Sequence, residues 1–201
     1  DFFADACEKN RESREAFKQR KGYPEKNILY VGRLIDNKGI LDLLKAFQIL
    51  SRDHQKIGLV LIGSGEGEER YKKFCEDQNI KNVFFEGFVH QDDLPAYYAA
   101  GDIFVLPTHS DTWGLVLNEA MASSLPVVCS DVAGAAYDLI KNGENGYTYE
   151  KGNVGELTEA LSKTLNSSKE SFGSKSYEII QIYSPEKCAL GFLRAIMRKK
   201  E

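Results

Sequence analysis

The chain has 201 residues, of which 42% are hydrophobic and 28% charged, and its formal net charge is −4. Length and composition are those of a globular domain with its own core. They exclude a membrane span, because no apolar run approaches the roughly 18 residues that a span needs, and the negative charge argues against nucleic acid as the main partner.

The cysteines indicate a reducing environment. They are widely spaced and form no Cys-x-x-Cys pair, which predicts a cytoplasmic protein without a disulfide framework or a zinc site. No secretory signal is visible. The four are Cys7, Cys75, Cys129 and Cys188.

The N-terminal region, 1–26, is polar and is predicted to be a linker and a helix, with the helix over 8–20. Phe2 and Phe3 resemble an anchor that follows a linker from a missing preceding domain. Basic residues collect over 14–26 and again over 198–200, and we expect both groups to be solvated tails. Because the chain begins with Asp1 rather than Met, we expect it to be a piece of a longer protein.

From residue 27 onwards, short apolar runs alternate with longer amphipathic segments. Strands are predicted over 27–31, 57–62, 82–85, 103–106, 127–129 and 146–149. Helices are predicted over 41–50, 68–78, 93–100, from 114 onwards, and over 133–140, 156–165, 175–183 and 185–198. The last of these helices has Ser184 as its N-cap and Pro185 at its first position.

This alternation predicts an α/β fold, namely a doubly wound, Rossmann-like sheet of six parallel strands with helices on both faces. The sheet domain would span 27–183, and 184–201 would be a C-terminal helix. Ligands of such folds bind at the carboxyl ends of the strands. The segments expected to carry the chemistry are therefore 32–38, 63–67, 87–94 and 108–119.

The stretch from Asp111 to Glu119 predicts an anion site between two carboxylates. The first amides of the helix that begins near Gly114 lack intrahelical partners, so they suit phosphate or sugar oxygens. Glycine allows a ligand to approach the backbone closely, and carboxylates accept hydrogen bonds from hydroxyl groups. A sugar joined to a diphosphate needs this combination. The amides belong to Gly114, Leu115 and Val116.

The sequence from Asp111 onwards resembles a known motif. The motif is an acidic residue, here Asp111, then seven residues and Glu119, followed by Ala120-Met121-Ala122 and Pro126-Val127-Val128. It is that of the retaining glycosyltransferases of the two-domain GT-B type, specifically glycosyltransferase family 4 (the group 1 glycosyltransferases). The resemblance covers most of the chain but corresponds only to the C-terminal, donor-binding half of such an enzyme.

The resemblance implies transfer of a hexosyl unit from a nucleoside diphosphate sugar to a glycan or lipid-linked acceptor. A missing N-terminal domain would bind the acceptor and would be the route to any membrane association. Glu119 would bind the ribose hydroxyls; the alternative is an ordinary exposed helix glutamate. Asp111 stands where the family often has Glu and would lie near the donor sugar.

Gly32-Arg33-Leu34, followed by Lys38-Gly39, resembles the family segment whose two cations bind the donor diphosphate. A guanidinium and an ammonium neutralise the charge that develops on a departing nucleoside diphosphate. The alternative is a pair of surface charges. No Asp-x-Asp is present, and the resemblance implies that neither a bound metal nor another cofactor is needed.

Two further loops are expected beside the nucleotide. The resemblance places Gly65 in a glycine turn near it, although a plain tight turn is an equal alternative. The backbone at Phe88 and Val89 would meet the base, and Leu94 would cover the base or belong to the core. His109 is expected to be a loop residue.

A doubly wound fold also serves two other classes of function. A non-catalytic nucleotide or sugar-nucleotide binding module would use the same fold. An NAD-dependent oxidoreductase needs a Gly-x-Gly-x-x-Gly fingerprint, whereas Gly63, Gly65 and Gly67 are spaced differently. The identity of the base and of the sugar stays open.

Overall fold

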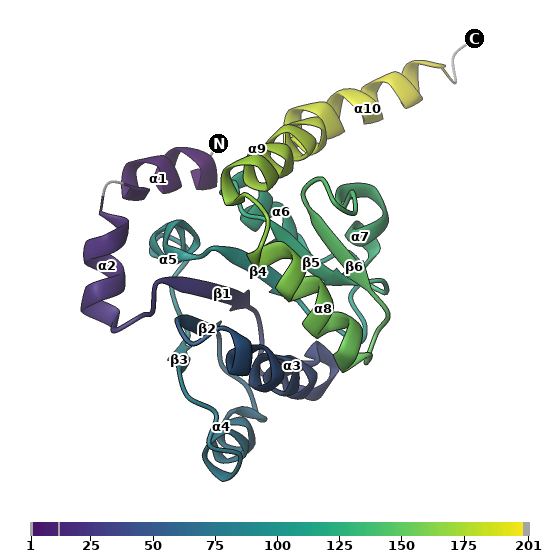
Figure 1. Cartoon of the computed structure of the whole chain (residues 1–201). Coiled ribbons are helices and arrows are strands. Elements are labelled where there is room, and N and C mark those ends of the chain that lie inside the picture. The colour runs from purple at the N-terminus through teal and green to yellow at the C-terminus, as the bar shows by residue number, and fades with distance from the viewer. Residues whose placement is uncertain (1, 12, 199–201) are drawn as a thin grey trace.

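The computed structural model describes residues 2–11 and 13–198 and shows a single sheet covered by helices on both faces (Figure 1). All six strands are parallel, in the order β3-β2-β1-β4-β5-β6. This confirms the predicted fold class. The strands are β1 Lys26–Val31, β2 Ile57–Ile62, β3 Val83–Gly87, β4 Ile103–Leu106, β5 Val127–Ser130 and β6 Gly146–Tyr149.

The helices connect these strands and extend beyond them at both ends of the described chain. The α-helices are α1 Phe2–Arg11, α2 Arg14–Lys21, α3 Ile40–Asp53, α4 Glu68–Asp77, α5 Leu94–Ala100, α6 Leu115–Ala122, α7 Gly134–Leu139, α8 Val154–Leu165, α9 Lys169–Ile180 and α10 Pro185–Arg198. Two 3-10 turns span Asp36–Lys38 and Gln181–Tyr183. Within the described residues, no helix combines the length and apolar character needed to cross a membrane.

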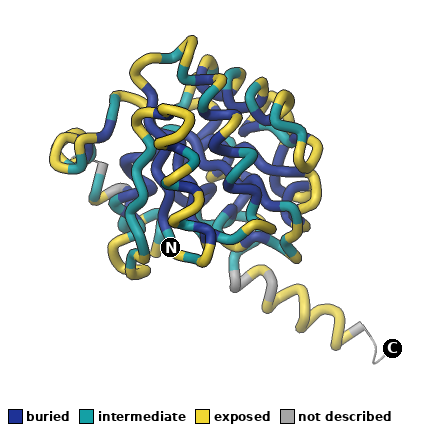
Figure 2. The backbone as a smooth tube through the Cα atoms, turned by 90° about the horizontal axis from the view of Figure 1, so that it is seen from below, coloured by how far each residue is buried: buried dark blue, intermediate teal, exposed yellow. Residues whose placement is uncertain are grey.

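Alternating strand residues build two separate cores, because successive side chains of a strand point to opposite faces. Leu29 and Phe104 belong to the core that also contains residues of α5, α6 and α9. Ile28 and Val105 belong to the core on the other face, with residues of α3, α4 and α8. Figure 2 shows the buried strands surrounded by partly exposed helices.

The C-terminal helix α10 projects away from the domain (Figures 1 and 2). Ser184 caps it, since its Oγ accepts a hydrogen bond from Lys187 N at 3.3 Å. The helix therefore begins at Pro185, as predicted. Large apolar side chains lie exposed along it: Leu190, Phe192, Leu193, Ile196 and Met197. Residues 199–200 of the predicted basic tail lie outside the described residues.

Two helix predictions were wrong. The helix expected over 8–20 is divided into α1 and α2. The helix expected over 175–183 begins at Lys169, because the Ser168 side chain accepts a hydrogen bond from Ser171 N and caps α9 there. Beyond Ile180 the chain continues as a 3-10 turn.

The expectation that 14–26 is a solvated basic tail was also wrong. Asp102 lies just before β4, and Arg14 Nη2 contacts its Oδ1 at 2.5 Å while Lys18 Nζ lies 3.3 Å from Oδ2. Lys18 is only 3% exposed. Burial would raise the pKa of the Asp102 carboxyl, but Lys169, Arg14 and Lys18 outweigh it and lower that pKa. A buried carboxylate needs such partners, and α2 supplies two of them.

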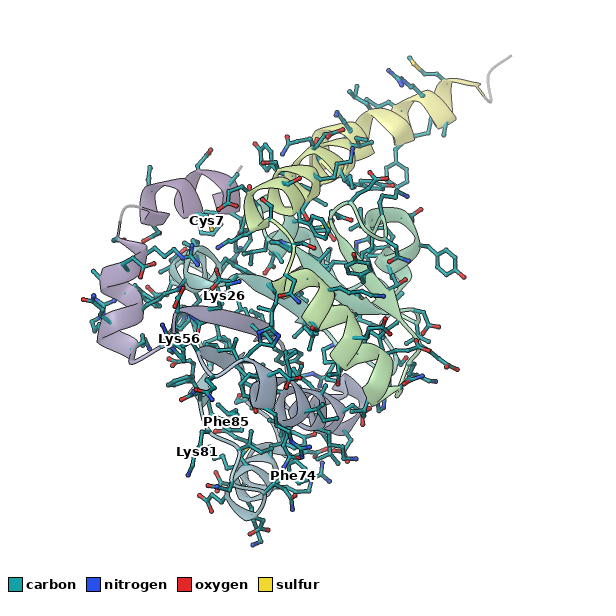
Figure 3. The ribbon with its side chains drawn as sticks, viewed as in Figure 1. Cys7, Lys26, Lys56, Phe74, Lys81 and Phe85 are labelled. Atoms are coloured by element: carbon teal, nitrogen blue, oxygen red, sulfur yellow. The ribbon has the colours of Figure 1, made fainter. Side chains whose placement is uncertain are left out.

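Phe3, rather than Phe2, fits the predicted N-terminal anchor. Its ring packs edge-on against the buried Tyr98 ring, with centroids 5.6 Å apart, whereas Phe2 is 47% exposed. Cys7, labelled in Figure 3, also holds α1 down, since its Sγ lies 3.1 Å from Ser123 Oγ. The first helix is thus packed onto the domain, and the division at residue 26 stays a prediction.

Candidate functional site

Two loops meet where the order of the sheet changes direction. The first half of the sheet runs outward from β1 and the second from its neighbour β4, so the loops after these strands adjoin. A Cβ on Gly39 would lie 1.9 Å from the Pro107 carbonyl oxygen. His109 N donates to Asn37 O at 2.7 Å. The fold therefore holds the segment around Lys38 firmly against the segment before Asp111.

A pocket of about 400 Å³ lies between these loops and the start of α6. Seven of the twelve predicted site residues line it: Gly32, Arg33, Lys38, Asp111, Gly114, Leu115 and Val116. They come from two segments that are far apart in sequence, 32–38 and 111–116. The remaining lining is supplied by Tyr30, Val31, Leu106, Thr112 and Trp113.

Lys38 and Asp111 form an ion pair inside this pocket. Lys38 Nζ lies 2.6 Å from Asp111 Oδ2, and the two side chains are 17% and 20% exposed. Asp111 Oδ1 also accepts a hydrogen bond from Trp113 N at 3.3 Å. Arg33 is exposed, and none of the ion pairs found among the described residues involves it. Arg33 is thus the cation of this pocket whose charge is left uncompensated.

The first turn of α6 lines the same pocket. Gly114 is its N-cap, with φ +93°, a conformation that favours glycine. Leu117 N already donates to Gly114 O at 2.8 Å, so the amides before it are the ones that an oxygen-rich ligand can use. Leu115 is 69% exposed. The helix start therefore combines an open approach with unfilled donors.

Glu119 lies outside the lining of this pocket and faces α5. Its Oε2 accepts a hydrogen bond from the buried Tyr98 hydroxyl at 2.8 Å. Burial raises the pKa of Glu119, and the hydrogen bond from Tyr98 opposes that rise. The alternative of an ordinary exposed helix glutamate does not fit this environment. The carboxylate is held in one orientation by a neighbouring element.

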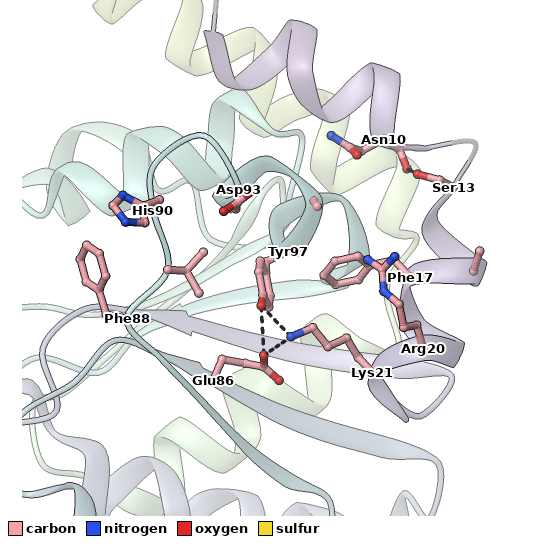
Figure 4. Close-up of a pocket in the computed structure, with 13 residues that line it drawn as sticks. Asn10, Ser13, Phe17, Arg20, Lys21, Glu86, Phe88, His90, Asp93 and Tyr97 are labelled. Carbon is pink, nitrogen blue, oxygen red and sulfur yellow. Dashed lines mark hydrogen bonds and ion pairs between the residues drawn. The ribbon is translucent and has the colours of Figure 1, made fainter.

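The loop after β3 borders a second pocket, of about 610 Å³ (Figure 4). Phe88 and Val89 line it on one side and Lys21 on the other. Lys21 pairs with Glu86, and Tyr97 OH lies 2.8 Å from Lys21 Nζ. Phe88 is 72% exposed. The two residues predicted to meet the base therefore line a different pocket from most of the predicted site.

The two other predicted residues serve packing in this structure. A Cβ on Gly65 would lie 2.4 Å from the Leu34 carbonyl oxygen, so glycine lets the loop after β2 approach the loop after β1. Leu94 packs against the core shared by α5 and α6. Contact of either residue with a nucleotide stays a prediction.

Sequence reasoning missed a contact beside the pocket. His109 Nε2 lies 2.6 Å from Asp42 Oδ2, which ties the loop after β4 to the first turn of α3. Neither residue belongs to the motifs of the sequence, and only the folded positions of the two loops bring them together. Over residues 2–11 and 13–198, no three His, Cys, Asp or Glu side chains gather closely enough to hold a metal ion.

Comparison with known proteins identifies a family. The family described as "Glycosyl transferases group 1" matches residues 11–180. The capsular polysaccharide biosynthesis glycosyltransferase CapM of Staphylococcus aureus is 33% identical over 144 residues, which are 69% of this chain and 36% of CapM.

Two solved structures resemble the fold. The C-terminal domain of the group 1 glycosyl transferase LpcC from Francisella tularensis has a TM-score of 0.75 at 22% identity, covering 84% of this chain and 91% of that domain. S. aureus TarM in complex with UDP has a TM-score of 0.77 at 25% identity, covering 86% of this chain and 35% of TarM. The chain thus spans about a third of the length of CapM and TarM.

Proposed function

The chain belongs to the group 1 glycosyl transferases, and from that premise we propose that it binds the nucleotide-sugar donor of a retaining hexosyltransferase. The acceptor, a glycan or a lipid-linked sugar, would be bound by a part of the enzyme outside these 201 residues. The observation that carries the proposal is the pocket at the β1–β4 junction, which gathers seven predicted site residues. TarM, a relative in fold, was solved with UDP.

In this proposal the diphosphate lies between Arg33 and the start of α6. The guanidinium and the first-turn amides supply positive charge where the departing nucleoside diphosphate becomes more negative. Lys38 adds a second cation from the same loop as Arg33. No metal or other cofactor is part of the proposal, since these groups provide the charge.

The two carboxylates are proposed to bind different ends of the donor. Asp111 lines the pocket beside Lys38 and would meet the transferred sugar. Glu119, oriented by Tyr98, would accept hydrogen bonds from the ribose. We place the protein in the cytoplasm, in keeping with the free thiols of Cys75 and Cys129.

Thermal-shift screening against UDP, GDP, ADP and their sugar derivatives tests the proposal. At least one nucleoside diphosphate should raise the melting temperature, because a ligand that binds only the native state stabilises it. Arg33→Ala should weaken that diphosphate by about 1.5–3 kcal/mol, the range for hydrogen bonds to charged groups, and should leave the parent nucleoside unaffected.

Arg52→Ala is the matched control, since Arg52 lies in the last turn of α3 and is absent from the lining of the donor pocket. It should bind the diphosphate as the wild type does. Failure of every nucleotide to bind, or equal losses in the two arginine variants, would contradict the proposal.

A further inference from the structure

The ion pair between Lys38 and Asp111 joins two groups that would otherwise serve different parts of the donor. Building on the proposed function, we propose that Asp111 is a specificity-determining residue that competes with the diphosphate for Lys38. The pocket would thereby discriminate against the free nucleoside diphosphate and favour the nucleotide that still carries its sugar.

The pair is sheltered and held from both sides. Lys38 Nζ lies 2.6 Å from Asp111 Oδ2, and both side chains are at most one-fifth exposed. Trp113 N donates to Asp111 Oδ1, and the close approach of Gly39 to Pro107 fixes the Lys38 loop. A partly buried ion pair in a fixed geometry is screened less by solvent than an exposed one. An anion that enters the pocket must therefore compete with Asp111 for Lys38.

The same loop carries a second ion pair for comparison. Asp36 pairs with Arg70 of α4, but these side chains are 73% and 58% exposed, and neither residue lines the pocket. The two acidic partners therefore differ in location and not in charge. Asp36 therefore provides an internal control for the effect proposed for Asp111.

Charge alone sets the direction of the effect. A bare diphosphate that enters the pocket must take Lys38 from Asp111 and then lie beside that carboxylate, a like-charge contact. A nucleotide sugar brings hydroxyl groups, which donate hydrogen bonds to Asp111 while Lys38 turns to the phosphates. Asp111 thus has a new partner only while the sugar is attached.

The same exchange would assist release of the product. Once the sugar has passed to the acceptor, Asp111 loses its hydroxyl donors and regains Lys38 as its best partner. The nucleoside diphosphate then loses part of its binding to the cation and dissociates more readily. Discrimination and release are two results of one competition.

Calorimetric titration of the 201-residue protein with UDP, GDP and ADP tests the inference. Asp111→Asn should bind whichever of them the wild type binds about threefold to tenfold more tightly, as expected from removing one partly screened charge. Asp36→Asn, which removes the same charge from the outer side of the loop, should change the affinity by less than about twofold.

The corresponding nucleotide sugars, UDP-glucose, GDP-mannose and ADP-glucose, form the second arm. Asp111→Asn removes a carboxylate acceptor from the sugar, so the preference for the nucleotide sugar over its diphosphate should fall by at least about fivefold. Asp36→Asn should preserve the preference of the wild type.

A double variant separates competition for Lys38 from simple repulsion. In a Lys38→Met background the gain from Asp111→Asn should shrink by more than half, because no lysine is left to release. A gain that persists in full in the Lys38→Met background would overturn the inference. It would also be overturned if Asp111→Asn alone left the affinity for the diphosphate unchanged or weakened it. Absence of binding by the wild type to all six nucleotides would instead overturn the proposed function.

Discussion

Tyr98 shows how a buried side chain can set the orientation of a functional one. Its hydroxyl donates to Glu119 Oε2 at 2.8 Å, and its ring is fully buried between the edge of Phe3 and the Phe104 ring. The hydroxyl is therefore fixed by packing. If Glu119 binds the ribose, Tyr98 is a positioning residue for that contact.

We expect Tyr98→Phe to weaken a nucleoside and its diphosphate equally, by about 0.5–1.5 kcal/mol, the typical contribution of one hydrogen bond. Both ligands carry the ribose, so both depend on the orientation of Glu119. Calorimetry below the melting temperature measures this. A loss confined to the diphosphate would show that Tyr98 acts elsewhere, and unchanged affinities would show that Glu119 does not depend on it.

Lys169 at the start of α9 links stability to pH. Burial lowers the pKa of Lys169 to about 8; Asp102 opposes this effect and Arg14 and Lys18 add to it. Below pH 8 the native and unfolded states both carry the proton. Between about 8 and the model-peptide value of about 10.4, only the unfolded state does, so the unfolding free energy gains a contribution that increases with pH.

The wild type should therefore become more stable relative to Lys169→Met as the pH rises from about 8 to about 10, and the difference should be constant below 7. Urea unfolding of both proteins at matched pH values measures it. A relative stability that falls over this interval would mean that Lys169 keeps its proton in the folded protein.

The residues of the pocket were predictable from the sequence, but their pairing was not. Strand ends and motif spacing indicated Arg33, Lys38 and Asp111 because these follow β1 and β4. The contact of Lys38 with Asp111, and that of Glu119 with Tyr98, depend on side-chain directions that only packing decides. Sequence patterns locate loops, whereas partners within a loop cluster follow from tertiary structure.

At the scale of elements, the strands were the most predictable part of the molecule. Buried parallel strands are short, continuous apolar runs, and the predicted bounds of β2, β4 and β6 coincide with the observed ones. The start of α9 was missed because Gly173 interrupts the helical pattern. A Cβ there would lie 2.2 Å from the Ser124 carbonyl oxygen, so tertiary contact, rather than helix propensity, selects the glycine.

Gly173→Ala should therefore destabilise the protein, although alanine is favoured over glycine in a helix interior by about 1 kcal/mol. Overpacking of this kind costs about 1–3 kcal/mol. Gly155→Ala in α8 is the matched control, because its Cβ would meet only Asn153 Oδ1, at 3.4 Å. Denaturant unfolding should show a loss for the first variant and none for the second. A gain for both would mean that α9 can move away from Ser124.

At the scale of the whole molecule, the amino and carboxyl ends of the strands have different roles. Asp102 precedes β4 and holds α2 and α9 through its three cations. Asp111 follows the same strand and lies in the proposed donor pocket. Since the two clusters share no residue, variants at one end should affect stability and variants at the other should affect binding, with nearly additive results.

The proposed donor pocket is bordered by Leu115, which is 69% exposed, and the chain spans about a third of the length of CapM and TarM. Sugar transfer needs donor and acceptor held together in reactive geometry, which supplies a large part of the rate enhancement.

We therefore expect the 201-residue protein to bind a nucleotide sugar without turning it over. Binding should be equal with and without a metal chelator, because in the proposed function Arg33, Lys38 and the start of α6 meet the charge on the diphosphate. The measurement is release of nucleoside diphosphate from UDP-glucose, GDP-mannose and ADP-glucose, with enzyme and donor at comparable concentrations so that a single turnover would be visible. Repeated turnover by this chain alone would place the whole active site within these 201 residues, and a chelator that abolished binding would remove the protein cations from their proposed role.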